Sequence, residues 1–422
     1  MPRILAIPLL IIFVILVVFG IFVARHPGRG RLRELITRIE ERRRVESRAP
    51  TTITHAGGPV ATPRPASSTS PGSGIVTSVT TLIPQQGGRV SWSKSNNLIA
   101  FSKFGSPNSS YNAEIYTMRS DGSDQVCLTC GKPQIPHESN DQPVWSPDGR
   151  FIVFQSIDPN LSLPALLPQR LKEQITQGGA GINNNLWAMT ADGSKFYQLT
   201  HITSGEASLH AHFSRNGSEL FWAARVVAPG AGPGRRGQWA LKIANFVVDS
   251  QGPHLTNIRT YQPLGAGPFY ESHDFTPDGS SIIYSASMSA RVLNLDIYET
   301  NLSTLKTVNL TNSPGVWDEH AHLAPDGKKI VWVSSQGYDF TPRANYGATL
   351  KTDFWLMNAD GSDKQQITFF NTPGSPEYTG NRVIVADNSW NARGDKLVAS
   401  LLSIGPAGRV SKIIVLNFAT PQ

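Results

Sequence analysis

One phrase returns six times along this chain: an aromatic or apolar residue, a small polar residue, a turn, and then a β-rich run. It reads WSKSNNLIAF from Trp92, WSPDGRFIVF from Trp145, FSRNGSELFW from Phe213, FTPDGSSIIY from Phe275, LAPDGKKIVW from Leu323 and WNARGDKLVA from Trp390. Successive copies begin 48 to 68 residues apart, which leaves room for a four-stranded antiparallel sheet and its loops. The repeat therefore predicts an all-β fold, a six-bladed β-propeller, with seven blades as the alternative count.

The turn inside the phrase follows from its residues. In Pro147-Asp148-Gly149, proline fixes one φ angle, aspartate supplies a side-chain acceptor, and glycine is free to take a positive φ. A second signal follows in three repeats, where Asp-Gly separates two β-rich runs that end at Thr129, Thr200 and Thr368. Asp-Gly between β-rich runs is a strong hairpin signal, so each repeat is expected to contain two hairpins.

The composition, and one predicted strand that belongs to no copy of the phrase, agree with a closed ring of blades. Hydrophobic residues make up 39% of the chain and charged residues 16%, with 37 glycines and 30 prolines, a turn-rich balance typical of all-β proteins. Ile75 to Ile83 reads as a strand that precedes the first repeat. We expect it to pair with Ser411 to Phe418, because an open ring would leave strand edges exposed. The propeller is therefore expected to span residues 75–422.

These paired phrases resemble the TolB-like, or PD40, variant of WD40-like propeller repeats. The pattern stands nearly intact from Trp145 to Thr200, and the resemblance covers roughly residues 75–420. It implies the fold rather than one function, since such repeats occur in periplasmic Tol-system proteins, in propellers attached to peptidases and in free-standing polysaccharide lyases. The sequence has no G-x-S-x-G nucleophile elbow, so an attached peptidase domain is not expected.

The first 74 residues differ in composition from the rest. After a flank of residues 1–3, residues 4–24 carry no charge, and their length is enough to cross a hydrocarbon core as a transmembrane helix. A cleaved secretory signal is the alternative, although its apolar region is normally shorter. Residues 25–48 form a basic amphipathic segment that is expected either to lie on an anionic membrane surface or only to space the anchor. Residues 49–74, rich in Pro, Ser, Thr and Gly, predict a disordered linker.

These segments predict a single-pass membrane protein. The arginines that follow the apolar run favour a cytoplasmic propeller. Similar propellers and the short flank favour an extracytoplasmic one in the cell envelope, which is our expectation. The net charge of +7 is concentrated in the basic segment, so no nucleic-acid binding is expected. The propeller is expected to be monomeric.

Six of the ten histidines stand just upstream of the repeated phrase, and acidic residues accompany them. In a propeller these positions belong to the innermost strand of each blade, so equivalent residues of different blades converge on one axis. The pattern predicts a divalent-metal site (Mn, Ca or Zn) from imidazole and carboxylate ligands. The expected ligands are His137, His210, His273 and His320, with His212, His322, Glu138, Glu271, Glu319 and Asp387 as further candidates. The alternative is a structural ring of polar groups that bond to one another and to water.

The clustered histidines also resemble, in part, those of oligogalacturonate lyases, propellers that hold a manganese ion through axial histidines next to similar phrases. This resemblance implies a metal-dependent lyase acting on acidic oligosaccharides, in which the metal would acidify the proton beside a uronate carboxylate. Those lyases have seven blades, and no general base or substrate-binding arginine is identifiable in this sequence. A membrane-anchored binding module that presents a protein or glycan site on one propeller face is therefore the first expectation, and the lyase is the second.

Other short motifs give less information about function. Cys127 and Cys130 form a lone C-x-x-C pair, which predicts a local disulfide or two ordinary thiols rather than a redox or zinc centre. Residues 232–237 match G-x-G-x-x-G without a strand–turn–helix context, which predicts a loop. The insertions 161–185 and 228–237 have no readable function.

Overall fold

The computed structural model describes residues 74–106, 109–161, 168, 172, 178–227, 237–287, 294–339 and 349–422. The expected transmembrane helix 4–24, the basic segment 25–48 and all but the last residue of the linker 49–74 lie outside the described residues. So do most of the insertions 161–185 and 228–237. No helix within the described ranges has the length and apolar character needed to cross a membrane.

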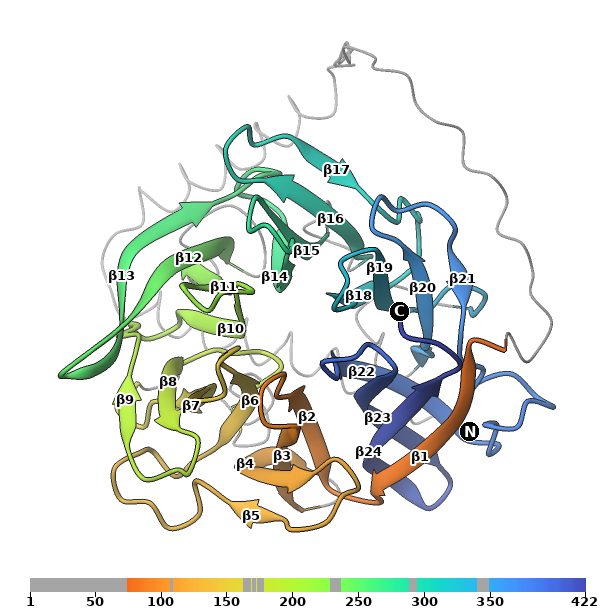
Figure 1. Ribbon diagram of the computed structural model, residues 1–422, viewed down its shortest axis with the longest axis horizontal. Coiled ribbons are helices and arrows are strands. Elements are labelled where there is room, and N and C mark those ends of the chain that lie inside the picture. The colour runs from red at the N-terminus through yellow and green to blue at the C-terminus, as the bar shows by residue number, and fades with distance from the viewer. Residues whose placement is uncertain are drawn as a thin grey trace, which may run out of the picture. The chain divides into compact units, whose positions relative to one another are not determined.

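Six four-stranded antiparallel sheets surround a central axis in the described part of the chain (Figure 1). From inside to outside, the first three blades are β2 (Gly87–Trp92), β3 (Leu98–Ser106), β4 (Ser109–Arg119) and β5 (Val126–Cys127); β6 (Asn140–Trp145), β7 (Phe151–Ile157), β8 (Asn184–Thr190) and β9 (Phe196–Gln198); and β10 (Ala207–Phe213), β11 (Glu219–Val227), β12 (Gln238–Asp249) and β13 (Gly252–Tyr261).

The next two blades are β14 (Phe269–Phe275), β15 (Ser281–Ser287), β16 (Asp296–Asn301) and β17 (Thr307–Asn309); and β18 (Asp318–Leu323), β19 (Lys329–Ser334), β20 (Asp353–Asn358) and β21 (Gln365–Gln366). The sixth is β22 (Arg382–Trp390), β23 (Lys396–Gly405), β24 (Gly408–Phe418) and β1 (Val76–Ile83). The six-bladed propeller expected from the repeat is confirmed, and the described residues form no seventh sheet.

The two ends of the propeller sequence meet in the sixth blade. β1 pairs antiparallel with β24, from Val76 opposite Phe418 to Ile83 opposite Ile413. Figure 1 shows β1 as the outermost strand of the sheet that holds the last three strands of the chain. The closing strand expected at Ile75 to Ile83 is confirmed, and the ring is held by backbone hydrogen bonds between its first and last strands.

The repeated phrase forms the turn between the first and second strand of a blade. In the second blade the Ser146 hydroxyl donates to Asp148 Oδ1 at 2.6 Å and accepts from the Phe151 backbone N–H at 3.0 Å. Gly149 takes a φ of 70°, as the turn requires. The same serine or threonine bond to an Asp or Asn two residues on recurs at Ser214 and Thr276.

The threonine that ends the second signal joins the fourth strand to the third. Thr200 Oγ1 accepts from the Leu186 backbone N–H at 2.8 Å and donates to Asn185 Oδ1 at 3.1 Å. Thr368 makes the equivalent pair of bonds to Phe354 and Asp353. The threonine that ends the second signal therefore has a structural role on the outer side of these blades.

The apolar cores lie between neighbouring blades. One cluster joins Phe221 of β11 to Tyr270 of β14 and Tyr284 of β15, and all three side chains are fully buried. The apolar side chains of the strands pack into these clusters between blades. The polar side chains of the innermost strands face the axis instead. The fold thus separates the residues that stabilise it from those that line the axis.

Candidate functional site

The innermost strand of every blade carries a β-bulge. Its register with the second strand shifts by one residue within the four residues that precede the repeated phrase, in β2, β6, β10, β14, β18 and β22. At the bulges Gln142, His210 and His320 take left-handed φ angles of 57°, 47° and 51°. Bulges re-aim side chains, and here they turn the third residue before the phrase toward the axis in five blades.

These five residues form what we call the axial ring: Arg89, Gln142, His210, His320 and Asp387. Arg89 Nε lies 3.0 Å from Asp387 Oδ2. The Gln142 amide nitrogen donates to Asp387 Oδ1 at 3.1 Å, and its oxygen accepts from Arg89 Nε at 2.8 Å and from His210 Nε2 at 2.9 Å. The fourth blade has Ser272 at this position, and its hydroxyl donates to the backbone oxygen of His210. Residues far apart in sequence are therefore bonded into one network.

Two glutamates orient the histidines of the axial ring. Glu271 Oε1 lies 2.7 Å from His210 Nδ1, and Glu319 Oε2 lies 3.3 Å from His320 Nε2. Glu319 also accepts from the Trp317 indole N–H at 2.9 Å. The two carboxyl groups are hydrogen-bonded to each other, which requires a proton between them.

Burial and neighbouring charges set the protonation of the ring. Burial lowers the pKa of both His210 and His320, so their imidazoles are neutral near pH 7, the form that binds metals. Burial alone would raise the pKa of Asp387, but the Arg89 guanidinium, followed by His320, holds it well below its usual range. Burial raises the pKa of Glu271 to about 7, and burial with the charge of Glu271 raises that of Glu319 well above its usual value.

The ring brings ligand-type atoms close enough to share one ion. One such atom from each of His210, His320 and Asp387 lies within 4.8 Å of the other two, and all three residues are buried. Glu271, Glu319 and His320 form a second group within the same limit, so the two groups overlap at His320. Two imidazoles, a carboxylate and the nearby Gln142 amide are a donor set that suits a divalent transition metal.

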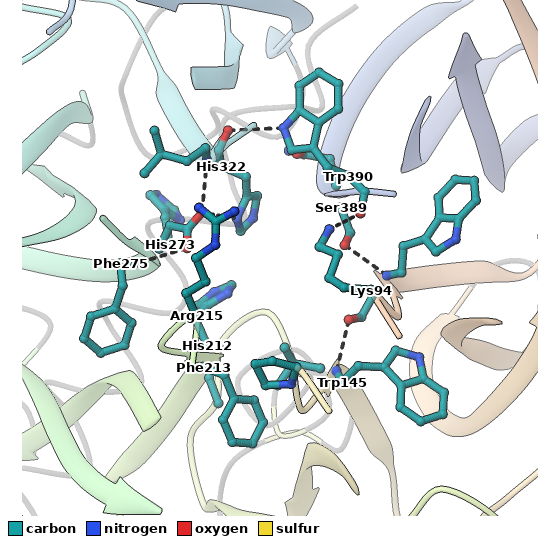
Figure 2. Close-up of a pocket in the computed structure, with 18 of the residues that line it drawn as sticks. Lys94, Trp145, His212, Phe213, Arg215, His273, Phe275, His322, Ser389 and Trp390 are labelled. Atoms are coloured by element: carbon teal, nitrogen blue, oxygen red, sulfur yellow. Dashed lines mark hydrogen bonds and ion pairs between the residues drawn. The ribbon is translucent and has the colours of Figure 1, made fainter. Parts of the chain in front are cut away.

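A cavity of 390 Å³ opens beside the axial ring. Figure 2 shows His212, His273 and His322 along one side of it, with Lys94 and Trp390 on the opposite side. The first residues of the repeated phrases, among them Trp145, Phe213 and Phe275, complete an aromatic wall. The cavity therefore joins a polar ring to an apolar, histidine-bearing chamber.

The histidines of the chamber retain bonding capacity. The ring centroids of His212 and His322 are 5.1 Å apart, and those of His273 and His322 are 6.3 Å apart. Burial lowers the pKa of His212 and His273 far below the usual value, so both are neutral. Their Nε2 and Nδ1 atoms, respectively, have no hydrogen-bond partner among the described residues. On these two histidines, a ligand in the chamber would meet neutral donors and acceptors.

The structure sorts the sequence-predicted residues into three places. His210, His320 and Asp387 lie in the axial ring, with Glu271 and Glu319 against them. His212, His273 and His322 line the chamber, where the Nε2 of His273 contacts the Ser285 hydroxyl. The metal role of all these residues stays a prediction.

The expected place of His137 and Glu138 at the axis is corrected by the structure. Both residues precede β6, and His137 is exposed. They line a separate surface pocket with Asp158 and Trp187. His137 stands eight residues before Trp145, whereas the bulge directs the third residue before it, Gln142, to the axis.

Sequence reasoning missed Arg89 and Gln142, because the clustering of histidines and acidic residues gives no sign of an arginine or a glutamine. The signal that finds them is positional. When the six copies of the phrase are aligned, the residues three places before the first position of each copy are, in chain order, Arg89, Gln142, His210, Ser272, His320 and Asp387.

The shared proton predicts a pH-dependent effect of Glu271→Gln on stability. Burial raises the pKa of Glu271 to about 7 in the folded protein, whereas it is near 4.5 in the unfolded chain. The stability that this proton gives is therefore present below pH 4.5 and is lost as pH rises through about 7. The side-chain amide of the Glu271→Gln variant can donate a hydrogen bond to Glu319 at any pH. The variant is therefore expected to unfold at a higher temperature than the wild type at about pH 8.5, and not at about pH 5.

Thermal unfolding in the presence of a chelator measures this difference. Chelation keeps metal binding from contributing to either midpoint. A difference in midpoint that is the same at both pH values would contradict the shared proton.

Comparison with known proteins gives weak similarities only. No family model matches the chain. It is similar to dipeptidyl-peptidase 5 of Porphyromonas endodontalis, 24% identical over 54% of this chain and 33% of that protein, so the chain spans about a third of that relative. It is also similar to an uncharacterized protein of Agrobacterium fabrum, 22% identical over 60% of this chain and 82% of that protein.

Two solved structures have comparable similarity. TolB from Acinetobacter baumannii is 15% identical over 78% of this chain and 65% of its own, with a TM-score of 0.45. Oligogalacturonate lyase from Vibrio parahaemolyticus is 13% identical over 81% of this chain and 95% of its own, with a TM-score of 0.45. At these levels the structures carry no argument about function, and the fold rests on the sheet topology of this chain.

Proposed function

We propose that this chain is a β-propeller binding module that holds a divalent metal ion at its axis. The observation that carries the proposal is the convergence of His210, His320 and Asp387, whose ligand atoms lie within 4.8 Å of one another in a buried ring. They come from the third, fifth and sixth blades, so only the closed ring assembles them. Two neutral imidazoles and one ionised carboxylate supply the charge and donor types that a transition metal needs.

The donor set narrows the choice of ion. Calcium takes six to eight oxygen ligands, whereas this ring offers two imidazole nitrogens. Zinc and manganese suit a mixed set of imidazole and carboxylate donors. The adjoining cavity of 390 Å³ lies within the range of small-molecule sites, so a ligand could complete the coordination from the chamber.

Metal titration of the full-length protein in detergent tests the proposal. After treatment with a chelator, calorimetry is expected to show one Zn²⁺ or Mn²⁺ ion bound per chain, with no competition from Ca²⁺. Lack of stoichiometric binding of either transition metal would contradict the metal site and leave the polar ring as a structural feature.

A metal-dependent lyase acting on acidic oligosaccharides is the second candidate. The observation that favours it is that Lys94 and Arg215, both exposed, line the same cavity as the histidines and could pair with uronate carboxylates. Each is bonded to a backbone oxygen, Lys94 to that of Trp390 and Arg215 to that of Pro325. Ultraviolet absorbance of an unsaturated uronate product, formed from polygalacturonate by the metal-loaded protein, distinguishes the lyase from the binding module.

We also propose that residues 4–24 anchor the protein in a membrane and that the propeller faces an extracytoplasmic compartment. The uncharged apolar run supports the anchor. The Cys127–Cys130 disulfide supports the location, because disulfides persist in oxidising compartments. The chamber would then be open to a protein or glycan ligand of the cell envelope.

The anchor predicts that the full-length protein stays with the membrane fraction after alkaline extraction. An apolar helix that spans the bilayer is not released by high pH, whereas a peripheral protein is. Deletion of residues 4–24 is expected to move the protein to the soluble fraction. A mature N-terminus close to residue 24 would show that the segment is a cleaved signal instead.

A further inference from the structure

The hydrogen bonds of the axial ring engage the atoms that a metal would use. The Gln142 amide nitrogen bonds to Asp387 Oδ1 at 3.1 Å, and the amide oxygen bonds to His210 Nε2 at 2.9 Å. Arg89 Nε lies 2.8 Å from the same amide oxygen and 3.0 Å from Asp387 Oδ2. One amide thus occupies two of the proposed ligands, and one guanidinium holds the amide in that orientation.

We infer that Gln142 is a fourth metal ligand and that Arg89 is an internal cation which the metal has to displace; this inference rests on the proposed function. Half a turn of the Gln142 amide directs its oxygen at Asp387 Oδ1, so that two oxygens face one point. Two acceptors 3.1 Å apart have no hydrogen between them and are stable only around a cation. The turned amide supplies that second oxygen.

The turned amide is incompatible with Arg89 in its present place. Its nitrogen would face Arg89 Nε at 2.8 Å, which sets two N–H donors against each other, and it would donate to His210 Nε2 at 2.9 Å, so that imidazole nitrogen binds the metal only after the amide has moved off it. Arginine also keeps its charge at any physiological pH, so it cannot release Asp387 by losing a proton. Metal binding therefore requires that the Arg89 side chain move away.

One flank of the Arg89 side chain is partly exposed and lies close to a second carboxyl group. Its side chain is 25% exposed, against 12% for Asp387 and 4% for His210. Gly179 lies beside the guanidinium, where a Cβ would be 2.6 Å from Arg89 Nη2. Asp141, a buried carboxyl group, lies against the neighbouring Gly178. Displacement from Asp387 would therefore leave the guanidinium beside a second carboxyl group and solvent.

The test compares metal affinity in the full-length protein and its variants. Arg89→Met keeps the length of the side-chain stem but removes the charge and the donors. It is expected to bind Zn²⁺ or Mn²⁺ about tenfold more tightly than the wild type or better, because a unit charge beside a divalent ion opposes binding by several RT. Adding Gln142→Leu to Arg89→Met removes the fourth ligand, and we expect the affinity to fall again by about tenfold.

Two further variants control for loss of an arginine elsewhere and for poor folding. Arg259→Met removes an arginine that pairs with Glu219 on the outer part of the third blade, and it should leave the affinity unchanged. Arg89→Gln, which keeps a neutral donor beside Asp387, is expected to show the same direction of change if Arg89→Met folds poorly.

Each result decides a separate point. An affinity of Arg89→Met equal to or weaker than wild type would show that Arg89 only orients Asp387, and would overturn its role as a competitor. Equal affinities of Arg89→Met and the double variant would overturn Gln142 as a ligand. Absence of binding in the wild type and in Arg89→Met would instead reject the proposed metal function itself. Binding by Arg89→Met alone would support Arg89 as a competing cation and would show that the wild-type ring does not hold a metal.

Discussion

Replacing both His210 and His320 with alanine is expected to abolish stoichiometric metal uptake and to leave the propeller folded. The pair supplies two of the three converging ligand atoms, and the third ligand, Asp387, is already paired with Arg89. Loss of both imidazoles is expected to weaken binding on the order of a thousandfold or more. The apolar cores lie between blades and contain neither histidine, so the circular dichroism spectrum should be retained.

The matched control replaces His137 and His201 with alanine. Both are exposed histidines that do not line the axial cavity, and their removal should leave one metal ion per chain. Metal content after dialysis against limiting Zn²⁺ or Mn²⁺ measures the comparison. Retention of stoichiometric metal by the His210 and His320 variant would reject these ligands, even if the wild type binds metal.

The sequence was sufficient for the architecture because the repeat encodes it redundantly. The phrases at Trp145 and Phe275 specify the same turn with the same hydroxyl and carboxylate pair, so a weak copy such as the one at Trp92 is identified by its neighbours. The closing strand was predictable for a related reason. A strand without a phrase of its own has to pair with the one remaining edge, that of Ser411 to Phe418.

The site was only partly predictable because its geometry depends on bulges. A bulge adds one residue to a strand and reverses the face on which the next side chains lie, and residue type alone gives no sign of it. His210 and His320 fall at the bulge and reach the axis, whereas His273 stands one place later and lines the chamber. His137 is the nearest histidine upstream of Trp145, but the bulge of its blade presents Gln142 to the axis instead.

The types of the axial-ring residues also do not predict which residues they contact. Arg89 carries no metal-ligand chemistry, so nothing in its type indicated a place beside Asp387. Their contact joins the first and sixth blades, whose innermost strands β2 and β22 are neighbours in the closed ring. Contacts of this kind can be predicted only when the closed arrangement of the blades is known.

Deletion of residues 75–83 from the full-length chain is expected to prevent stable folding. The deletion removes β1 and leaves the edge of β24 unpaired from Ile413 to Phe418. It also uncovers apolar side chains of the sixth blade, against which Val76 and Val79 pack. Domains of this kind are stable by only about 5–15 kcal/mol, and the loss of one of four strands in a sheet with its packing is of similar size.

The expected result is aggregated protein, because an exposed edge strand pairs with other chains. Size-exclusion chromatography and circular dichroism measure the monomer yield and the β-sheet content. Deletion of residues 49–57 removes a stretch of the same length from the linker and keeps β1, so that variant should unfold at the wild-type temperature. A soluble monomer with wild-type unfolding after deletion of residues 75–83 would show that β22, β23 and β24 close the ring without β1. In that case the pairing of β1 with β24 would be an addition to the ring, and the contact between Arg89 and Asp387 would survive its loss.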